Sequence, residues 1–392
     1  MSDCNDSAIT TTPPEIWWSI LEHTVGIGYL FADTIDGDVE AASPWDNSLG
    51  GHNYFRQFEK AKKQIFILGL VCKSWKQCVD SIASRFLILK APGNNKNWDM
   101  EVITAAQIVY AVSYKPLLPN LLEKLVQWRV LETTLDDAME MRRIPHPNLR
   151  RLDLHDRYQK PVVPLFDANT LIYALSAFSQ ITWFSYYTLS RYLAISGAEG
   201  PAMTFPNLRV LQYHSNGRPC LPYRRLILPS LRHLSIQISE LDQGYYPLCK
   251  PILIGYGPTL RSISINVHSL GCLMYSDEGA SFPDWSQVPQ LRYLMFTAAI
   301  SLIFQPLPRT HPLRVFAAEI WKIDDLHLWL DSDNLREVRM LWAIWEPNGI
   351  LVRKSRGRPC IDELAIRQGI DQYTMERLRV KAACRGIVLR TD

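Results

Sequence analysis

The chain has 392 residues, of which 47% are hydrophobic and 21% are charged, and its formal net charge is +3. This composition excludes an intrinsically disordered chain and provides enough apolar material for a large core. The longest apolar run, residues 294–304, is shorter than the roughly 20 residues of a membrane helix, and no secretory signal is recognisable. The eight Cys residues form no zinc-type spacing, so we expect reduced thiols, no metal, no membrane association and a cytoplasmic or nuclear location.

Two helical segments separated by an acidic loop are predicted near the N-terminus. Residues 1–12 are polar and lack periodicity, and we expect them to be disordered. Residues 13–22 begin with two prolines and continue as an amphipathic helix. Residues 25–58 are rich in Gly, Asp, Ser and Asn and are interpreted as an inserted loop. Helical character returns over residues 57–79, and residues 85–89 have the apolar pattern of a strand.

A tetrapeptide, Pro-x-Leu-Arg, occurs five times and begins a repeated pattern. Each copy continues into alternating apolar residues, whose best form is Leu-x-x-Leu-x-Leu. In the copy at Leu149, this alternation places Leu152 and Leu154 on one face of a short strand, and Arg151 and Asp153 on the other. The leucines of the five motifs are Leu149, Leu208, Leu231, Leu260 and Leu291.

Weaker copies of the pattern extend the repeat in both directions. They start at residues 125, 181, 313, 335 and 361, and the intervals between successive starts range from 22 to 32 residues. The intervals scatter around the roughly 20–29 residues of a leucine-rich repeat. One unit cannot bury its own apolar face, whereas stacked units share a core and align their strands in a parallel sheet. Residues 91–392 are therefore predicted to form an irregular α/β solenoid with a parallel β-sheet on its concave face; the alternative is a run of ordinary strands in an unrelated α/β protein.

Further helices are predicted between and after the repeats. Apolar periodicity indicates helices at residues 99–110 and 136–143. The chain is predicted to end with an amphipathic helix over residues 370–384, a stop at Gly386, and a closing strand at residues 387–389 that shields the edge of the array.

The N-terminal helices resemble an F-box. The resemblance rests on Pro13-Pro14-Glu15-Ile16, on Ile20-Leu21, and on the more specific Leu70-Val71-Cys72-Lys73-Ser74-Trp75, followed by a strand and irregular leucine-rich repeats. The acidic insertion is similar to that of the large F-box families of fungi. One position departs from the family pattern, because Thr12 stands where Leu is usual.

This resemblance implies a function in ubiquitin ligation. Residues 13–90 would form a helical F-box domain that docks on a Skp-type adaptor, which links it to a cullin scaffold. The chain would be the substrate-recognition subunit of an SCF-type ligase and not itself an enzyme. Carried over by position, the adaptor-binding residues are Pro14, Glu15, Ile16, Ile20, Leu21, Leu70, Val71, Cys72 and Trp75. The alternative is that these residues cap the end of the repeat array.

The outward strand positions of the repeats are candidates for binding a protein substrate. They form a polar row with few charges, which suits protein recognition better than a phosphate backbone. The alternative is a solvated surface, with the ligand held on loops. The candidate residues are Arg151, Asp153, Gln212, His214, His233, Ser235, Gln237, Asn266 and Tyr293.

Other functions have weaker support in the sequence. There is no recognisable nucleophile motif, phosphate-binding loop or metalloprotease motif, so we expect no catalytic residue and no cofactor. The segment from Arg353 to Pro359 contains Arg-Gly-Arg-Pro, which resembles the core of an AT-hook, a motif of the DNA minor groove. A basic loop is the default interpretation, so nucleic acid is an unlikely partner. A repeat scaffold that holds proteins together without a ligase is the other alternative.

Overall fold

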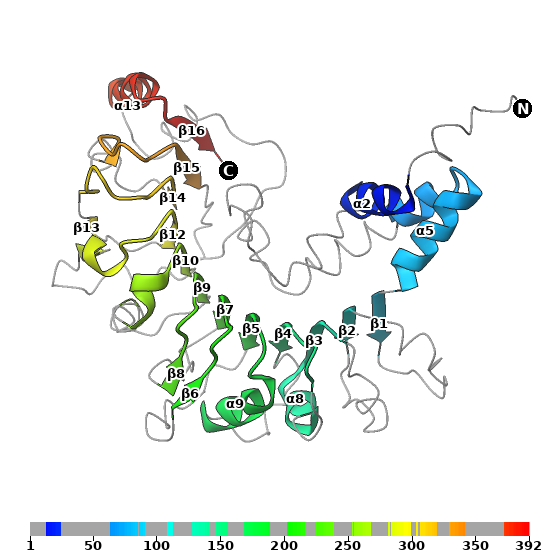
Figure 1. Cartoon of the computed structure of the whole chain (residues 1–392). Helices are drawn as coiled ribbons and strands as arrows, with labels where there is room; N and C mark the ends of the chain where they lie inside the picture. Colours follow the sequence, from blue (N-terminus) through cyan, green and yellow to red (C-terminus); the bar gives the residue numbers. More distant parts are fainter. Residues whose placement is uncertain are drawn as a thin grey trace, which may run out of the picture. The chain divides into compact units, whose positions relative to one another are not determined.

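The structure is a computed structural model of the whole chain (Figure 1). It describes residues 13–24, 63–84, 86–90, 108–112, 128–141, 146–155, 168–188, 202–215, 225–238, 253, 255–267, 281–282, 284–298, 303–304, 306–319, 329–341 and 372–391. The chain divides into two compact units. The first comprises residues 1–158 and 173–184, and the second comprises residues 159–172 and 185–392. The segments predicted as a disordered N-terminus (1–12), an inserted loop (25–58) and an AT-hook-like loop (353–359) lie outside the described residues.

The first unit combines a helical pair with a parallel sheet. Its helices are α2 (Pro14–Thr24), a helix at residues 63–69, α5 (Lys73–Ser84) and α8 (Leu135–Met141). Its strands are β1 (Phe86–Lys90), β2 (Ile108–Val112), β3 (Val130–Thr134) and β4 (Arg151–His155). The strands follow the order β1-β2-β3-β4, and each neighbouring pair is parallel. Strand β1, inside the predicted F-box-like domain, thus already belongs to the sheet.

The second unit continues the same kind of strand order. Its main strands are β7 (Val210–Ser215), β9 (His233–Ile238), β10 (Ser262–Val267), β12 (Tyr293–Ala298), β14 (Val315–Glu319), β15 (Glu337–Leu341) and β16 (Val388–Thr391). They pair in that order, and all of the pairs are parallel. Two small parallel pairs, β6 (Met203–Thr204) with β8 (Leu226–Ile227) and β11 (Ser281–Phe282) with β13 (Ile303–Phe304), lie outside the main sheet.

Strand β5 (Trp183–Thr188) and helix α9 (Ala168–Leu175) include residues of both units. The prediction of an α/β chain with a parallel sheet is confirmed.

Each Pro-x-Leu-Arg motif forms a tight turn before its strand. At the first motif, the amide of Leu149 donates a hydrogen bond of 3.2 Å to the carbonyl of His146, which places Pro147 second in a four-residue turn. Pro is favoured there because its ring presets φ. The other four motifs close the same turn, with bonds of 3.1–3.4 Å. The leucine of each motif is buried, with at most 2% of its surface exposed.

The strand predictions hold for most of the described copies, with one displaced copy and one helix prediction corrected. The copy predicted at Leu125 is displaced by three residues, because Leu131 pairs with Leu152 and Trp128 therefore takes the place of Leu149. The predicted helix 99–110 is wrong at its end, where residues 108–110 belong to β2; the rest of it lies outside the described residues. The copy predicted at Ile361 lies outside the described residues, and β15 pairs with β14 and β16.

The C-terminal segment has the predicted helix, stop and strand. Helix α13 (Gln372–Cys384) is terminated by Gly386, which lies two residues after its last residue and adopts a φ of 66°. The amide of Gly386 donates to the carbonyl of Ala383 and that of Ile387 donates to the carbonyl of Ala382, the two bonds of a Schellman motif. Strand β16 then pairs with β15.

Candidate functional site

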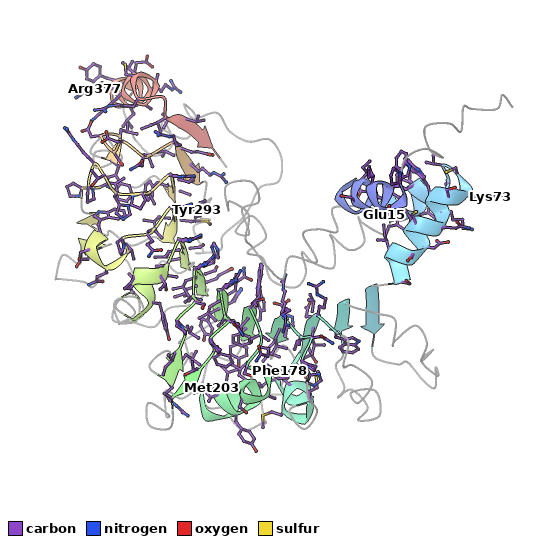
Figure 2. All side chains as sticks on the ribbon, in the orientation of Figure 1. Glu15, Lys73, Phe178, Met203, Tyr293 and Arg377 are labelled. Carbon is purple, nitrogen blue, oxygen red and sulfur yellow. The ribbon has the colours of Figure 1, made fainter. Side chains whose placement is uncertain are left out.

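The two N-terminal helices pack through their aromatic residues. The ring centroids of Trp17 on α2 and Trp75 on α5 are 5.4 Å apart, and the planes are inclined by 54°. Leu21 on α2 and Val79 and Ile82 on α5 are almost completely buried. Figure 2 shows the pair, with Glu15 labelled on α2 and Lys73 at the start of α5. These contacts use one side of each helix.

The Leu-Val-Cys-Lys-x-Trp segment is a turn between two helices. The amides of Leu70 and Val71 donate to the carbonyls of Ile67 and Leu68, each at 3.1 Å, which closes the helix at residues 63–69. The sulfur of Cys72 accepts a bond of 3.4 Å from the amide of Trp75 and thereby caps the first turn of α5. The continuous helical character predicted over residues 57–79 is thus interrupted at residues 70–72, outside the helices on either side.

The other sides of these helices expose apolar side chains. Leu70 is 72% exposed and Val71 is 55% exposed at the turn, while Ile16 and Ile20, one helical turn apart on α2, are 49% and 44% exposed. Phe66 and Ile67, which precede Leu70 by a few residues in the sequence, are also exposed. These six are the majority of the eleven large apolar side chains found exposed in the described part of the chain. Such concentrations of exposed apolar surface mark interaction sites in soluble proteins.

The nine predicted adaptor-binding residues therefore divide by exposure. Glu15, Ile16, Ile20, Leu70 and Val71 are exposed; Cys72 and Trp75 are half-buried; Leu21 is buried; the side chain of Pro14 is outside the described ones. The sequence prediction missed Phe66 and Ile67. The sequence does contain a signal for their exposure: the apolar run at residues 65–68 is too continuous for one face of a helix to bury.

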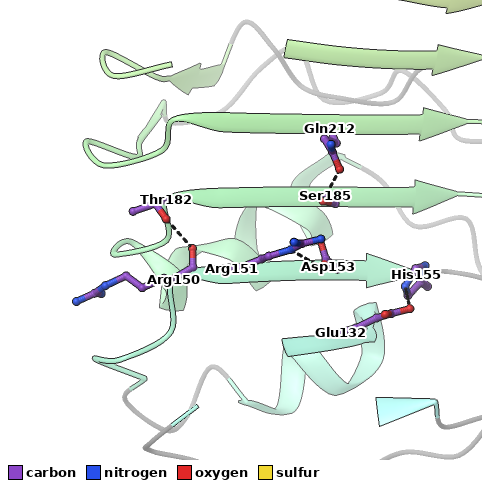
Figure 3. A network of polar contacts seen from close by, with 8 residues as sticks. All are labelled: Glu132, Arg150, Arg151, Asp153, His155, Thr182, Ser185 and Gln212. Carbon is purple, nitrogen blue, oxygen red and sulfur yellow. Dashed lines mark hydrogen bonds and ion pairs between the residues drawn. The ribbon is translucent and has the colours of Figure 1, made fainter. Parts of the chain in front are cut away.

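In the first unit, the predicted substrate-binding residues of β4 form a buried polar network (Figure 3). The Nε atom of Arg151 donates to Asp153 at 2.8 Å, and both side chains are at most 3% exposed. The guanidinium carbon of Arg151 lies 4.2 Å from the ring centroid of Trp183. The imidazole of His155 pairs with Glu132 on β3. Pairing and the aromatic ring offset the cost of burying the Arg151 charge. The network holds neighbouring strands together and leaves Arg151 and Asp153 little accessible surface.

In the second unit, the polar row has both buried and accessible members. Gln212 is half-buried and accepts a hydrogen bond of 3.1 Å from the hydroxyl of Ser185. His214 is half-buried, with its ring centroid 5.6 Å from that of Tyr187. Ser235, Gln237, His233 and Tyr293 are buried, and the side chain of Asn266 lies outside the described ones. Among these predicted residues of the second unit, Gln212 and His214 offer the most access to a substrate.

His233 is held neutral by its surroundings. Burial, together with the positive charges of Arg232 and Arg261, lowers the pKa of its imidazole from 6.5 to about 4. His214 and His233 lie on neighbouring strands, and the strand register pairs His233 with Val210 and His214 with Gln237. Because a strand rises about 3.3 Å per residue, the two imidazoles belong to levels roughly 13 Å apart. No group of metal-ligating side chains occurs among the residues that the structure describes.

Comparison with known proteins gives no family assignment. A scan against protein-family models finds no match, and no curated protein matches the chain. None of the helices in the described ranges has both the length and the apolar character needed to span a membrane.

Proposed function

We propose that the chain is the substrate-recognition subunit of an SCF-type ubiquitin ligase, in which residues 13–90 dock on a Skp-type adaptor. The observation that carries the proposal is the pattern of exposure on the N-terminal helical pair. Leu70 and Val71 at the turn are exposed although the fold buries Val79 and Ile82 on the following helix. A small helical unit that leaves such residues uncovered is completed by a partner with a matching apolar surface.

The resemblance to F-box proteins makes a Skp-type adaptor the expected partner. The turn that exposes Leu70 and Val71 is formed by the more specific of the two motifs on which the resemblance rests. Thr12, the one departure from the pattern, precedes the described part of α2. The solenoid formed by the repeats would then present a protein substrate, and the chemistry would belong to enzymes recruited by the cullin.

Co-expression with a tagged Skp-type adaptor tests this function. We expect the full chain to be captured with the adaptor, and single substitutions Leu70→Asp and Ile16→Asp to abolish capture, because each places a charge in an apolar interface. The matched control is Val380→Asp, which adds the same charge at an apolar side chain that is 54% exposed on α13. If the wild-type chain is not captured, the ligase function is wrong, and a repeat scaffold without a ligase becomes the better account.

A further inference from the structure

The arginine that follows the first leucine of a repeat forms a column in the second unit. Six strands that are neighbours in the main sheet, β7, β9, β10, β12, β14 and β15, are each preceded directly by an arginine: Arg209, Arg232, Arg261, Arg292, Arg314 and Arg336. We call these six residues the arginine column. They lie one residue before the strands begin and are therefore not among the outward strand positions.

Backbone hydrogen bonds fix the column in register. The amide of Arg232 donates to the carbonyl of Arg209 at 2.9 Å, and the amide of Arg261 donates to that of Arg232 at 2.7 Å. The same bond, at 2.8 Å, links each of the three remaining arginines to the one before it. Neighbouring strands in a sheet are about 4.8 Å apart, so the six residues extend over roughly 24 Å.

A turn contact orients the guanidinium group of Arg336, the last member of the column. The Nη1 atom of Arg336 donates to the carbonyl of Asp333 at 3.0 Å, three residues back in its turn. In the first unit, Arg150 makes the equivalent contact with Pro147 at 3.0 Å, and Figure 3 shows its side chain extending past the start of β4. Arg292 and Arg336 are exposed, and the other members of the column are half-buried. A guanidinium has five N–H donors, so a turn contact orients it without using all of them.

The column concentrates positive charge along one line. Like charges on neighbouring strands repel each other. The residues on either side of the first five arginines carry no acidic group: each is preceded by Leu and followed by Val210, His233, Ser262, Tyr293 or Val315. Glu337 follows Arg336, but its carboxylate pairs with Arg339 at 2.8 Å. Burial is the largest cause of the lowered pKa of His233, and the positive charges of Arg232 and Arg261 lower it further.

We propose that the arginine column binds an extended acidic segment of a partner protein, through the carboxylate or phosphoryl groups of successive side chains. Arginine suits this role because its planar fork matches both anions with two parallel hydrogen bonds. Single-stranded nucleic acid is usually held by aromatic side chains beside the cations, whereas the two aromatic rings that follow the column, His233 and Tyr293, are buried. The inference concerns the second unit alone and does not depend on adaptor docking.

Peptide titration of the full chain tests the proposal. The probe is a labelled peptide of alternating Glu and Ser, about ten residues long, which is sufficient to span the column at ~3.3 Å per residue. A version with phosphoserine in place of Glu distinguishes the two anion sources, and a Gln-Ser peptide is the neutral control. The test variant combines Arg232→Gln, Arg261→Gln and Arg292→Gln. The matched control combines Arg377→Gln, Arg379→Gln and Arg385→Gln in and directly after α13, where Arg377 is labelled in Figure 2.

We expect salt-sensitive binding of an acidic peptide that weakens on the order of tenfold in the column variant and less than twofold in the control, since each exposed charge pair contributes modestly. A Lys version of the column variant should bind more tightly than the Gln version and more weakly than the wild type, because Lys retains the charge but lacks the planar fork. It also separates binding from folding, because it retains the charge while it loses the arginine-specific turn contact. The proposal is overturned if the wild-type chain binds neither acidic peptide, if both variants lose binding equally, or if an oligothymidine competes better than the acidic peptides.

Discussion

The indole ring of Trp75 packs against that of Trp17, with the ring centroids 5.4 Å apart. This contact joins α2 to α5 beside the buried side chains of Leu21 and Val79. Trp75 therefore supports the helical pair, whereas Leu70 and Val71, which precede it in the same motif, are exposed at the turn. One motif thus supplies a residue for packing and exposed residues, to which the proposed function assigns the contact with the adaptor.

We predict that Trp75→Ala destabilises the first unit by about 2 kcal/mol, since it removes a half-buried ring and its aromatic partner contact. Leu70→Ala should change stability by less than about 0.5 kcal/mol, because an exposed side chain loses few contacts. Urea unfolding of both variants, with limited proteolysis near residue 70 as a local readout, measures the difference. Equal stability of the two variants would show that the Trp17–Trp75 contact does not hold the pair together.

The turn at Gly257 is predicted to tolerate no side chain. A Cβ atom at this position would overlap the backbone carbonyl of Gln287 in the next repeat, which cannot move aside without shifting the turn at Pro289. We expect Gly257→Ala to cost at least about 2 kcal/mol, as overpacking against backbone does. The control is Gly255→Ala, where nothing lies within 4 Å of the added atom. Urea midpoints of the two variants should differ clearly; coinciding midpoints would contradict the close approach of the two repeats.

Gly386 is predicted to contribute through its backbone conformation alone. Its φ of 66° lies in the left-handed region, and no atom lies within 4 Å of an added Cβ. Gly386→Ala should therefore cost about 1 kcal/mol, the penalty for an L-residue in this conformation. Gly386→Asn should cost less, because Asn adopts this region more readily. Thermal unfolding checks the order Gly, Asn, Ala; Ala as stable as Gly would mean that the chain does not end α13 in this way.

The buried imidazole of His233 predicts a loss of stability in mild acid. Its pKa is about 4 in the folded chain, against 6.5 for an unshifted imidazole, so the unfolded state binds the proton more readily between these values. Stability should fall as the pH drops through this window, and this residue should account for about 2 kcal/mol between pH 7 and pH 5. His233→Gln should flatten that part of the profile. Urea unfolding at several pH values measures it, and parallel profiles for wild type and variant would exclude His233 as the cause.

The strand positions could be predicted because the residues of the repeat determine its backbone geometry. Pro sets the turn, the leucine is buried, and the alternation after it assigns the faces, as at Leu231 and Leu234. The displaced copy beginning at Trp128 was missed because an aromatic replaces leucine and Thr133 occupies an apolar position. The sequence predicts a helix at residues 108–110 because a short apolar run fits the period of a helix as well as that of a strand. Only the pairing with β1 and β3 makes these residues a strand.

The candidate sites were less predictable than the fold. The alternation of apolar and polar residues predicts which side chains share a face of a strand, but it does not predict whether neighbouring residues cover that face. Arg151 and Asp153 belong to the polar face as predicted, yet they are buried because they pair with each other and Arg151 packs on Trp183 from the next strand. Hydrophobicity alone did not predict the exposure of Leu70, since an apolar run of this kind is equally compatible with a core position; only the family resemblance placed Leu70 on a binding surface.

Titration calorimetry of a purified Skp-type adaptor into the full chain measures adaptor docking itself. We expect a one-to-one complex whose affinity falls at least about tenfold with Leu70→Asp, since burying a leucine side chain contributes roughly 2 kcal/mol. Val380→Asp should leave the affinity unchanged. No binding by the wild-type chain, or equal losses for the two variants, would contradict adaptor docking through the exposed face of the helical pair.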